Sequence, residues 1–368
     1  MGFPRMAIVH ERFTELGGSE TCVAQFFENW PRAEVFAPIV EPDSVRPPLH
    51  TVHDTWLSKA HSVTRSHAPL MPFVPRALRK LPLRNRFDAV LISHFAFATQ
   101  AVFATDAPTI AYVHSPARWA WDPAFRAQEA GGRTGQAALS VLGEFARRNE
   151  LRAALHLSHV IANSRAVAER VHDWWGLPAS VINPPVHVDR FTPAPAIPRE
   201  DFFLYAGRLV PYKRADLAIR AAQQAGVRLV VLGDGRYRQH LESIAGPETT
   251  FLGATSFEVL LDTYRRARAL LMPGVEDFGI VPVEAMACGT PVIAVGAGGA
   301  LDTVIPGVSG EHVPFGSDAA VIEGFAKAMA AFGIADYDPS TIRDHAITFS
   351  PNTFRNRIAA TVDEVLAG

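Results

Sequence analysis

The chain has 368 residues, a formal net charge of −2, 48% hydrophobic side chains and two cysteines. This length predicts about two domains, and the near-neutral charge gives no reason to expect nucleic-acid binding. Cys22 and Cys288 fall in predicted helices without a partner motif, so neither a disulfide framework nor a zinc site is indicated. No apolar run approaches the roughly 20 residues that cross a bilayer. The sequence therefore predicts a cytoplasmic protein without a membrane span.

Alternating strand and helix patterns run through the chain and predict an α/β fold with parallel sheets. The first unit is a strand from Met6 to Val9, a loop, and a helix over about 19–30. Gly17 and Gly18 in this loop would bring backbone amides to the helix start, which is the geometry of a phosphate cradle. We expect Ser19 to cap this helix and Glu20 to favour its dipole. A plain turn is an equally good interpretation of two adjacent glycines.

The segment 59–86 is basic throughout and contains no acidic residue. Two interpretations stay open for it. One is an irregular surface loop that covers part of the core. The other is a membrane-surface patch, in which the cations meet anionic lipid and the interleaved apolar side chains enter the interface. The basic residues are Lys59, Arg65, Arg76, Arg79, Lys80, Arg84 and Arg86.

Two short apolar runs, 88–93 and 109–113, are typical of buried parallel strands. The second runs directly into His114, and Arg118 follows shortly after. Open α/β sheets bind ligands at the carboxyl ends of their strands, so this position favours a functional role for His114 over a structural one. A long helix over 135–157 and a strand over 160–162 follow. The proline-rich run 193–198 is the best linker candidate.

A second domain opens with a predicted strand over 202–206, followed by Gly207, Arg208 and Lys213. An arginine and a lysine across a loop at a strand end suit a diphosphate, because arginine chelates two oxygens and lysine adds a point charge. The next strand ends in Gly233, Asp234 and a further glycine. The third glycine of a dinucleotide fingerprint is absent, which argues against a nicotinamide site.

The stretch EDFGIVPVEAMACGTP at 276–291 places Glu276 and Glu284 on either side of an apolar loop. We expect a helix that begins near Pro282, with Glu284 in its first turn, where the helix dipole would keep the carboxylate ionised. Gly279 would let the backbone approach a ligand. The alternative is that Glu284 only caps its helix and Glu276 is a solvated loop charge.

Five motifs occur in one order: GGSE at 17–20, HSPARWAWD at 114–122, GRLVPYK at 207–213, GDG at 233–235 and EDFGIVPVE at 276–284. Together they resemble the retaining glycosyltransferases of family four. That resemblance implies the GT-B architecture, with two facing Rossmann-like domains over 1–192 and 193–350. It also implies that a C-terminal helix, 351–368, crosses back to the first domain.

The resemblance further implies a set of site residues. Arg208 and Lys213 would neutralise the donor diphosphate, Glu284 would accept the ribose hydroxyls, and Glu276 and His114 would contact the transferred sugar. The leaving phosphate would take the acceptor proton, so no separate base is required. Asp336 and Asp338 lie far from these residues in sequence and are interpreted as turn residues, so no metal or cofactor is expected. The other donor-binding positions implied are Gly17, Gly18, Gly207, Gly233, Asp234, Phe278, Gly279, Ile280 and Val281.

The strings HSPARWAWD, GRLVPYKRADLAI and DFGIVPVEAM are similar to those of bacterial mannosyltransferases that build O-antigens and exopolysaccharides. That similarity implies GDP-mannose as the donor, a lipid-linked glycan acceptor and a peripheral position on the inner face of the cell membrane. Arg118, with Arg76, Arg79, Lys80 and Arg84, would serve the acceptor or the membrane. The alternatives are a transferase that uses UDP- or another nucleotide sugar, an epimerase of the same fold, and a non-catalytic nucleotide-sugar-binding protein.

Overall fold

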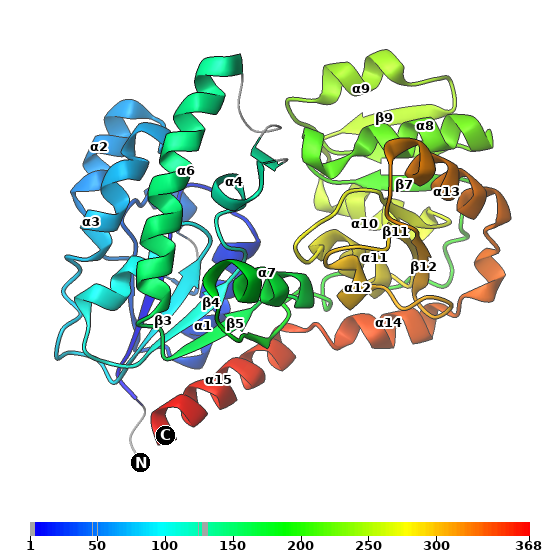
Figure 1. Cartoon of the computed structure of the whole chain (residues 1–368). Helices are drawn as coiled ribbons and strands as arrows, with labels where there is room; N and C mark the ends of the chain where they lie inside the picture. Colours follow the sequence, from blue (N-terminus) through cyan, green and yellow to red (C-terminus); the bar gives the residue numbers. More distant parts are fainter. Residues whose placement is uncertain (1–3, 46, 50, 124, 127–131) are drawn as a thin grey trace. The chain divides into compact units, whose positions relative to one another are not determined.

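The computed structural model describes residues 4–45, 47–49, 51–123, 125–126 and 132–368. They form two compact units (Figure 1): unit 1 comprises Met1–Pro185 with Pro351–Gly368, and unit 2 comprises Val186–Ser350. Each unit contains a six-stranded sheet in which every strand pairing is parallel. The predicted α/β class with parallel sheets is confirmed. Residues 186–192 group with unit 2, so the first stretch of unit 1 ends at Pro185.

The sheet of unit 1 has the strand order β2-β1-β3-β4-β5-β6. Its central strands are buried on both faces, which explains why they read as continuous apolar runs. The order reverses between β1 and β3, and in open α/β sheets this reversal opens a crevice at the carboxyl ends of the strands. The strands are β1 (Met6–His10), β2 (Glu34–Phe36), β3 (Ala89–His94), β4 (Thr109–Val113), β5 (His159–Ala162) and β6 (Ser180–Val181).

The last helix of the chain belongs to unit 1. Phe354 of α15 (Pro351–Ala367) stacks on Phe26 of α1 (Gly18–Asn29) with ring centroids 5.6 Å apart, and it meets the edge of Tyr112 at 5.5 Å. Burial of this aromatic cluster holds the helix against the sheet. The other helices of unit 1 are α2 (Trp56–Thr64), α3 (Val74–Leu78), α4 (Arg118–Trp121), α6 (Gly132–Ala154) and α7 (Arg165–Trp175).

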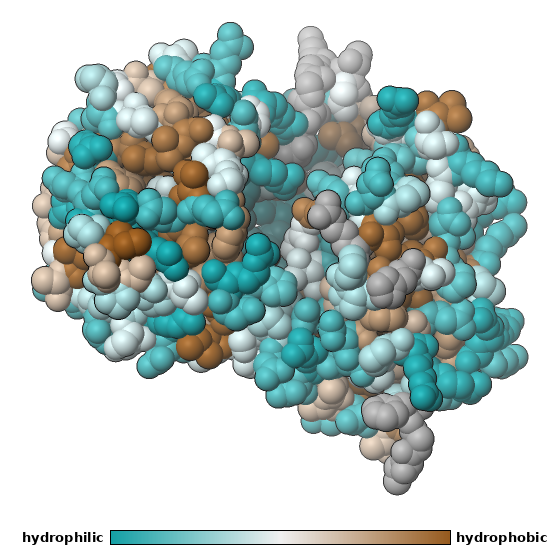
Figure 2. Space-filling view, turned by 180° about the vertical axis from the view of Figure 1, so that it is seen from behind, coloured by the Kyte–Doolittle hydropathy of each residue, from teal (hydrophilic) through white to brown (hydrophobic). Residues whose placement is uncertain are grey.

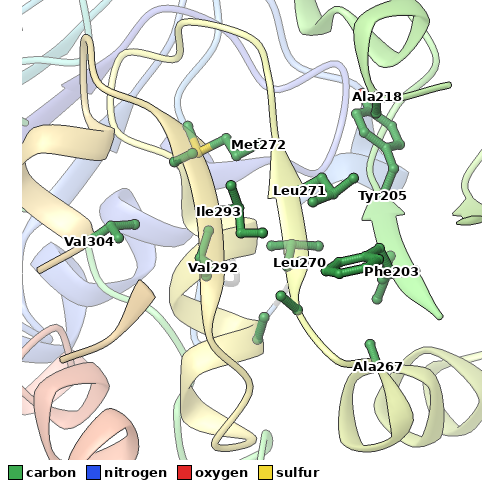
Figure 3. Packing of buried hydrophobic residues seen from close by; sticks show 14 of the residues in the cluster. Phe203, Tyr205, Ala218, Ala267, Leu270, Leu271, Met272, Val292, Ile293 and Val304 are labelled. Carbon is green, nitrogen blue, oxygen red and sulfur yellow. The ribbon is translucent and has the colours of Figure 1, made fainter. Parts of the chain in front are cut away.

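Unit 2 repeats the plan with the strand order β12-β11-β10-β7-β8-β9. Figure 3 shows how Phe203 of β7 (Phe203–Ala206), Leu270 of β10 (Leu270–Met272) and Val292 of β11 (Val292–Val295) pack together in its core. The outer strands are β8 (Leu229–Leu232), β9 (Thr249–Gly253) and β12 (Gly310–Val313). The helices are α8 (Ala215–Ala225), α9 (Arg238–Ile244), α10 (Phe257–Arg266), α11 (Ile280–Ala287), α12 (Ala300–Thr303), α13 (Asp318–Ala331) and α14 (Pro339–Ile347).

The basic segment 59–86 covers part of the core, as one of the two interpretations proposed, but it is largely helical and not an irregular loop. It contains most of α2, a 3₁₀ helix over Ala68–Phe73, and α3. Most of its apolar side chains, including Leu70, Leu78 and Leu83, are buried in the core of unit 1. Packing in this core accounts for the spacing of these apolar side chains, so membrane contact is not needed to explain it. Phe73 is an exception, because its side chain is 49% exposed.

The surface of each unit is mixed in character. Figure 2 shows one face, on which polar residues cover most of the area and hydrophobic residues form separate patches. Among the residues that the structure describes, no helix is both long enough and apolar enough to cross a membrane.

Candidate active site

The carboxyl ends of β1, β3 and β4 in unit 1 bring three polar side chains together. The Nε2 atom of His114 lies 2.9 Å from Ser93 Oγ, and the same hydroxyl lies 3.0 Å from Nδ1 of His10. His10 and Ser93 are fully buried, and His114 is half-buried. Sequence reasoning identified His114 but missed its two partners. The available signal was that all three residues stand at the ends of parallel strands.

The loop before α1 joins the same group of side chains. Nε2 of His10 lies 3.2 Å from Glu20 Oε1, while Glu20 Oε2 accepts hydrogen bonds from the Gly17 amide and from Ser19 Oγ, both at 2.9 Å. The helix begins at Gly18, so the prediction that Ser19 caps it is wrong. The Gly17 amide is bonded within the protein, and of the two predicted cradle glycines Gly18 is the one at the start of the helix.

Burial strongly favours the neutral form of His114. Desolvation, together with the neighbouring His10, lowers the pKa of its imidazole to about 3, although Glu20 opposes the shift. Its backbone amide donates to the carbonyl of His94 at 2.9 Å. A neutral imidazole can donate from one ring nitrogen and accept at the other, which suits contacts with sugar hydroxyls.

The segment after His114 is held by a buried carboxylate. Glu150 of α6 accepts hydrogen bonds from the amide of Ala117 and the indole of Trp121, and its Oε1 lies 3.0 Å from Nε2 of His94. These bonds position the start of α4, where Arg118 is half-buried and lies 3.7 Å from Asp122. The sequence did not single out Glu150, because a helical glutamate carries no local sign of such burial.

In unit 2, glycines allow the loops after β7, β8 and β10 to pack in contact. A Cβ atom on Gly233 would collide with the backbone of Gly207, and one on Gly274 would lie 2.8 Å from the carbonyl oxygen of Lys213. Real Cβ atoms do not approach a backbone that closely, so only glycine fits. Next to Gly233, the Asp234 carboxylate accepts from the following amide at 2.7 Å and so holds its own turn.

The two predicted charges of opposite sign in these loops meet directly. Lys213 Nζ donates to Glu276 Oε1 at 2.6 Å, and the two side chains are 15% and 25% exposed. Glu276 is therefore not a solvated loop charge. An ammonium group carries three N–H donors, so Lys213 can hold Glu276 and still donate to a ligand oxygen. Arg208, at the exposed start of the β7 loop, directly follows Gly207.

The structure corrects the expected setting of Glu284. The helix α11 begins at Ile280 after Gly279, whose φ is +93°, so Glu284 lies in the second turn and not in the first. Burial raises the pKa of its carboxyl group to about 7, against a hydrogen bond from Tyr264 and the charges of Arg190 and Lys213. The expectation that the helix dipole keeps this carboxylate ionised is therefore wrong, because Glu284 lies beyond the first turn and burial raises its pKa.

Tyr264 is a second residue that the sequence did not reveal. Its hydroxyl donates to Glu284 Oε2 at 3.1 Å, and its ring is almost completely buried. A buried tyrosine needs an acceptor for its hydroxyl group, and here that need fixes the direction of the Glu284 carboxylate.

The loop between the two glutamates is packed and not free in solvent. Phe278 is buried against Phe349, with ring centroids 5.6 Å apart, and the amide of Gly299 donates to the carbonyl of Glu276 at 2.9 Å. Ile280 and Val281 are half-buried at the start of α11. Within the described ranges, His, Cys, Asp and Glu side chains form no group of three that could hold a metal ion.

Two glycosyltransferase family models match successive parts of the chain. Residues 16–190 match the family described as Glycosyltransferase Family 4, and residues 189–331 match Glycosyl transferases group 1. Each of these matches spans less than half of the chain, and together they run from residue 16 to residue 331.

Curated relatives include the D-inositol 3-phosphate glycosyltransferases of Mycolicibacterium smegmatis and Mycolicibacterium gilvum. The first is 33% identical over 212 residues, which are 51% of this chain and 46% of the relative. The second is 33% identical over 213 residues, which are 51% of this chain and 45% of the relative. The matches therefore span about half the length of these relatives.

Solved structures confirm the predicted GT-B fold. Anabaena Alr3699/HepE, solved in complex with UDP, superposes with a TM-score of 0.71 and 19% identity over 98% of this chain and 100% of its own. Sucrose-phosphate synthase from Thermosynechococcus elongatus superposes with a TM-score of 0.75 and 19% identity over 99% of both chains.

Proposed function

We propose that the protein is a glycosyltransferase that moves a hexosyl group from a nucleotide sugar to a glycan acceptor, with retention of configuration and without a metal ion. The observation that carries this proposal is the Lys213–Glu276 ion pair, which joins the β7 and β10 loops beside a half-buried Glu284. The two glycosyltransferase domain matches support the same conclusion.

The charges of unit 2 suit a diphosphate that gains negative charge as it leaves. Arg208 would chelate two phosphate oxygens, and Lys213 would donate to a third while it stays bonded to Glu276. Glu276 would accept from hydroxyl groups of the sugar, and Glu284 from those of the ribose. Because hydroxyl groups donate to the ionised carboxylate, nucleotide affinity should rise as the pH passes through the Glu284 pKa of about 7.

We propose GDP-mannose as the donor, on the similarity of the motifs to bacterial mannosyltransferases. A UDP-sugar is the second candidate, since Alr3699/HepE has been solved with UDP and with UDP-glucose. Calorimetric titration with GDP, UDP, ADP and NAD decides between them. Preference for GDP supports mannose transfer, whereas preference for UDP keeps the class and overturns the donor. Binding of NAD alone would overturn the class.

Two acceptors are consistent with what is known of the chain's relatives and motifs. We propose a lipid-linked glycan, and D-inositol 3-phosphate is the alternative that the names of the curated relatives suggest. Incubation of the enzyme and labelled donor with each acceptor separates them. Product formation that continues in excess EDTA, with the donor's anomeric configuration kept, would support metal-independent retention. Loss of activity on chelation would contradict it.

The role of Glu276 is tested by Glu276→Gln. We expect turnover to fall by at least about a hundredfold with nucleotide affinity nearly kept, because the amide cannot carry the charge that stabilises the developing transition state. The matched control is Glu323→Gln, which removes one carboxylate from the exposed Glu323–Lys327 pair, also 2.6 Å long, and should leave turnover unchanged. Equal loss in both variants would overturn the assignment of Glu276.

A membrane-surface role for unit 1 is a weaker proposal that rests on charge alone. Arg76 and Lys80 are exposed. Arg79 is exposed as well, but it donates to Gln100 at 2.9 Å and to Asn149 at 2.8 Å, so it serves the fold. Arg76→Glu with Lys80→Glu should weaken binding to vesicles that contain anionic lipid and leave the weaker binding to neutral vesicles unchanged. Equal binding by parent and variant would overturn this role.

A further inference from the structure

A chain of hydrogen bonds, buried at its centre, links the start of α1 to His114. It runs from the Gly17 amide to Glu20, from Glu20 to His10, from His10 to Ser93, and from Ser93 to His114, with each link between 2.9 and 3.2 Å. The members come from four separate segments of unit 1. His10 and Ser93 are inaccessible to solvent, so water cannot replace the hydrogen bond between them.

Aromatic rings enclose the middle of this chain. Phe13 and Phe95 lie against His10 with ring centroids 4.8 and 6.0 Å away, and Phe95 also lies 6.5 Å from His114. In such surroundings a hydrogen bond is stronger than in water, and a polar atom left unpaired is costly. Every donor in the chain must therefore face an acceptor.

This requirement sets the direction of each proton. The Glu20 carboxylate already accepts from Gly17 and Ser19, and an ionised carboxylate is an acceptor only, so His10 must donate to it from Nε2. A neutral imidazole has one proton, which leaves Nδ1 of His10 as an acceptor for the Ser93 hydroxyl. The lone pairs of Ser93 Oγ then accept from Nε2 of His114.

We propose that Glu20, His10 and Ser93 act as positioning residues that hold His114 as its Nε2–H tautomer and keep its Nδ1 as a hydrogen-bond acceptor. The tautomer follows from the hydrogen bonds when His10 carries a single N–H proton. Its use, to accept from a hydroxyl group of the transferred sugar, rests on the proposed function. Because Glu20 also holds the Gly17 amide, the same carboxylate positions the loop before α1.

The reverse polarity is the physical alternative. If His10 carried two protons, its Nδ1 would donate to Ser93, Ser93 would donate to Nε2 of His114, and His114 would be the Nδ1–H tautomer. The two arrangements have the same heavy-atom positions. Only the location of the proton on His114 distinguishes them.

Long-range nitrogen–proton correlation spectra of protein labelled with ¹⁵N at histidine, recorded at pH 8, report this tautomer directly. A His114→Gln variant assigns the resonance. We expect the Nε2–H pattern in the parent and a mixed pattern in Ser93→Ala, which removes the link. We also expect a shift toward Nδ1–H in Glu20→Gln, because an amide NH₂ can donate to His10. Ser164→Ala is the control, since it removes a similarly buried hydroxyl that caps α7 and should leave His114 unchanged.

Turnover measurements then test the use of the tautomer. In Ser93→Ala we expect kcat to fall about five- to tenfold, as loss of one oriented hydrogen bond implies, with nucleotide affinity unchanged. An Nδ1–H pattern for His114 in the parent would overturn the proposal. A His114 pattern that stays the same in both Ser93→Ala and Glu20→Gln would also overturn it. If no transfer occurs with any donor, the proposed function fails while the spectra still decide the tautomer.

Discussion

Replacement of Glu284 by glutamine should make the protein more stable at alkaline pH. The Glu284 carboxyl pKa is about 7 in the folded protein, against an ordinary value of 4.5, and the main cause is burial. A rise of this size corresponds to about 3 kcal/mol of unfavourable free energy for the ionised form. Because the side chain is only half-buried, we expect about 1 to 3 kcal/mol in practice. Glutamine removes the charge and can still accept from Tyr264.

The sign follows from proton linkage. Between pH 4.5 and about 7 the folded protein keeps a proton on Glu284 that the unfolded chain has released, so the contribution of this group to stability falls as the pH rises. Below this range Glu284 is protonated in both states and does not lower the free energy of unfolding. Above it the carboxylate is ionised in both states and lowers that free energy by the full amount. Parent and variant should therefore differ little at pH 5 and by about 1 to 3 kcal/mol at pH 8.

Urea unfolding at both pH values provides the measurement. All the tryptophans of the chain lie within residues 1–185, so their fluorescence follows unit 1, while circular dichroism follows both units. The variant should shift only the dichroism transition. Glu323→Gln is the control, because the pKa of that exposed carboxyl group is lowered by its bond to Lys327, and it should give no gain at pH 8. A gain from Glu284→Gln that is the same at pH 5 and pH 8 would refute the reasoning.

Three further changes follow from single contacts. Tyr264→Phe removes a hydrogen bond to the Glu284 carboxylate, so its pKa should rise further and nucleotide affinity at pH 7 should fall about fivefold by calorimetry. Gly299→Ala adds a Cβ that collides with the backbone of Phe278, so urea unfolding should show about 1 to 3 kcal/mol lost and calorimetry should show weaker nucleotide binding. Phe354→Ala opens a cavity beneath α15 and should cost about 3 to 5 kcal/mol in the tryptophan-monitored transition of unit 1, with nucleotide binding kept. Unchanged nucleotide affinity in the first two variants, or an unchanged tryptophan transition in the third, would contradict these expectations.

The sequence by itself determined the fold class and predicted the residues that we propose for the site in unit 2. Strands that are buried on both faces must be continuously apolar, and loops whose backbones touch must carry glycine. Both requirements leave local patterns in the amino-acid sequence, so the strands and the loops could be predicted from it. The charged residues proposed for the site could also be recognised in the sequence, because they lie in or just after the loops that follow predicted strands. They are Arg208, Lys213, Glu276 and Glu284.

Only the tertiary structure decided how these side chains are paired and charged. The pKa of Glu284 depends on burial by neighbours that no local pattern reveals, and a dipole argument from its helix position was wrong. Likewise, Ser93 joins His10 across 83 residues of sequence because β1 and β3 are adjacent in the sheet. Protonation and hydrogen-bond direction depend on which groups share a buried space, and packing of the folded chain alone sets that.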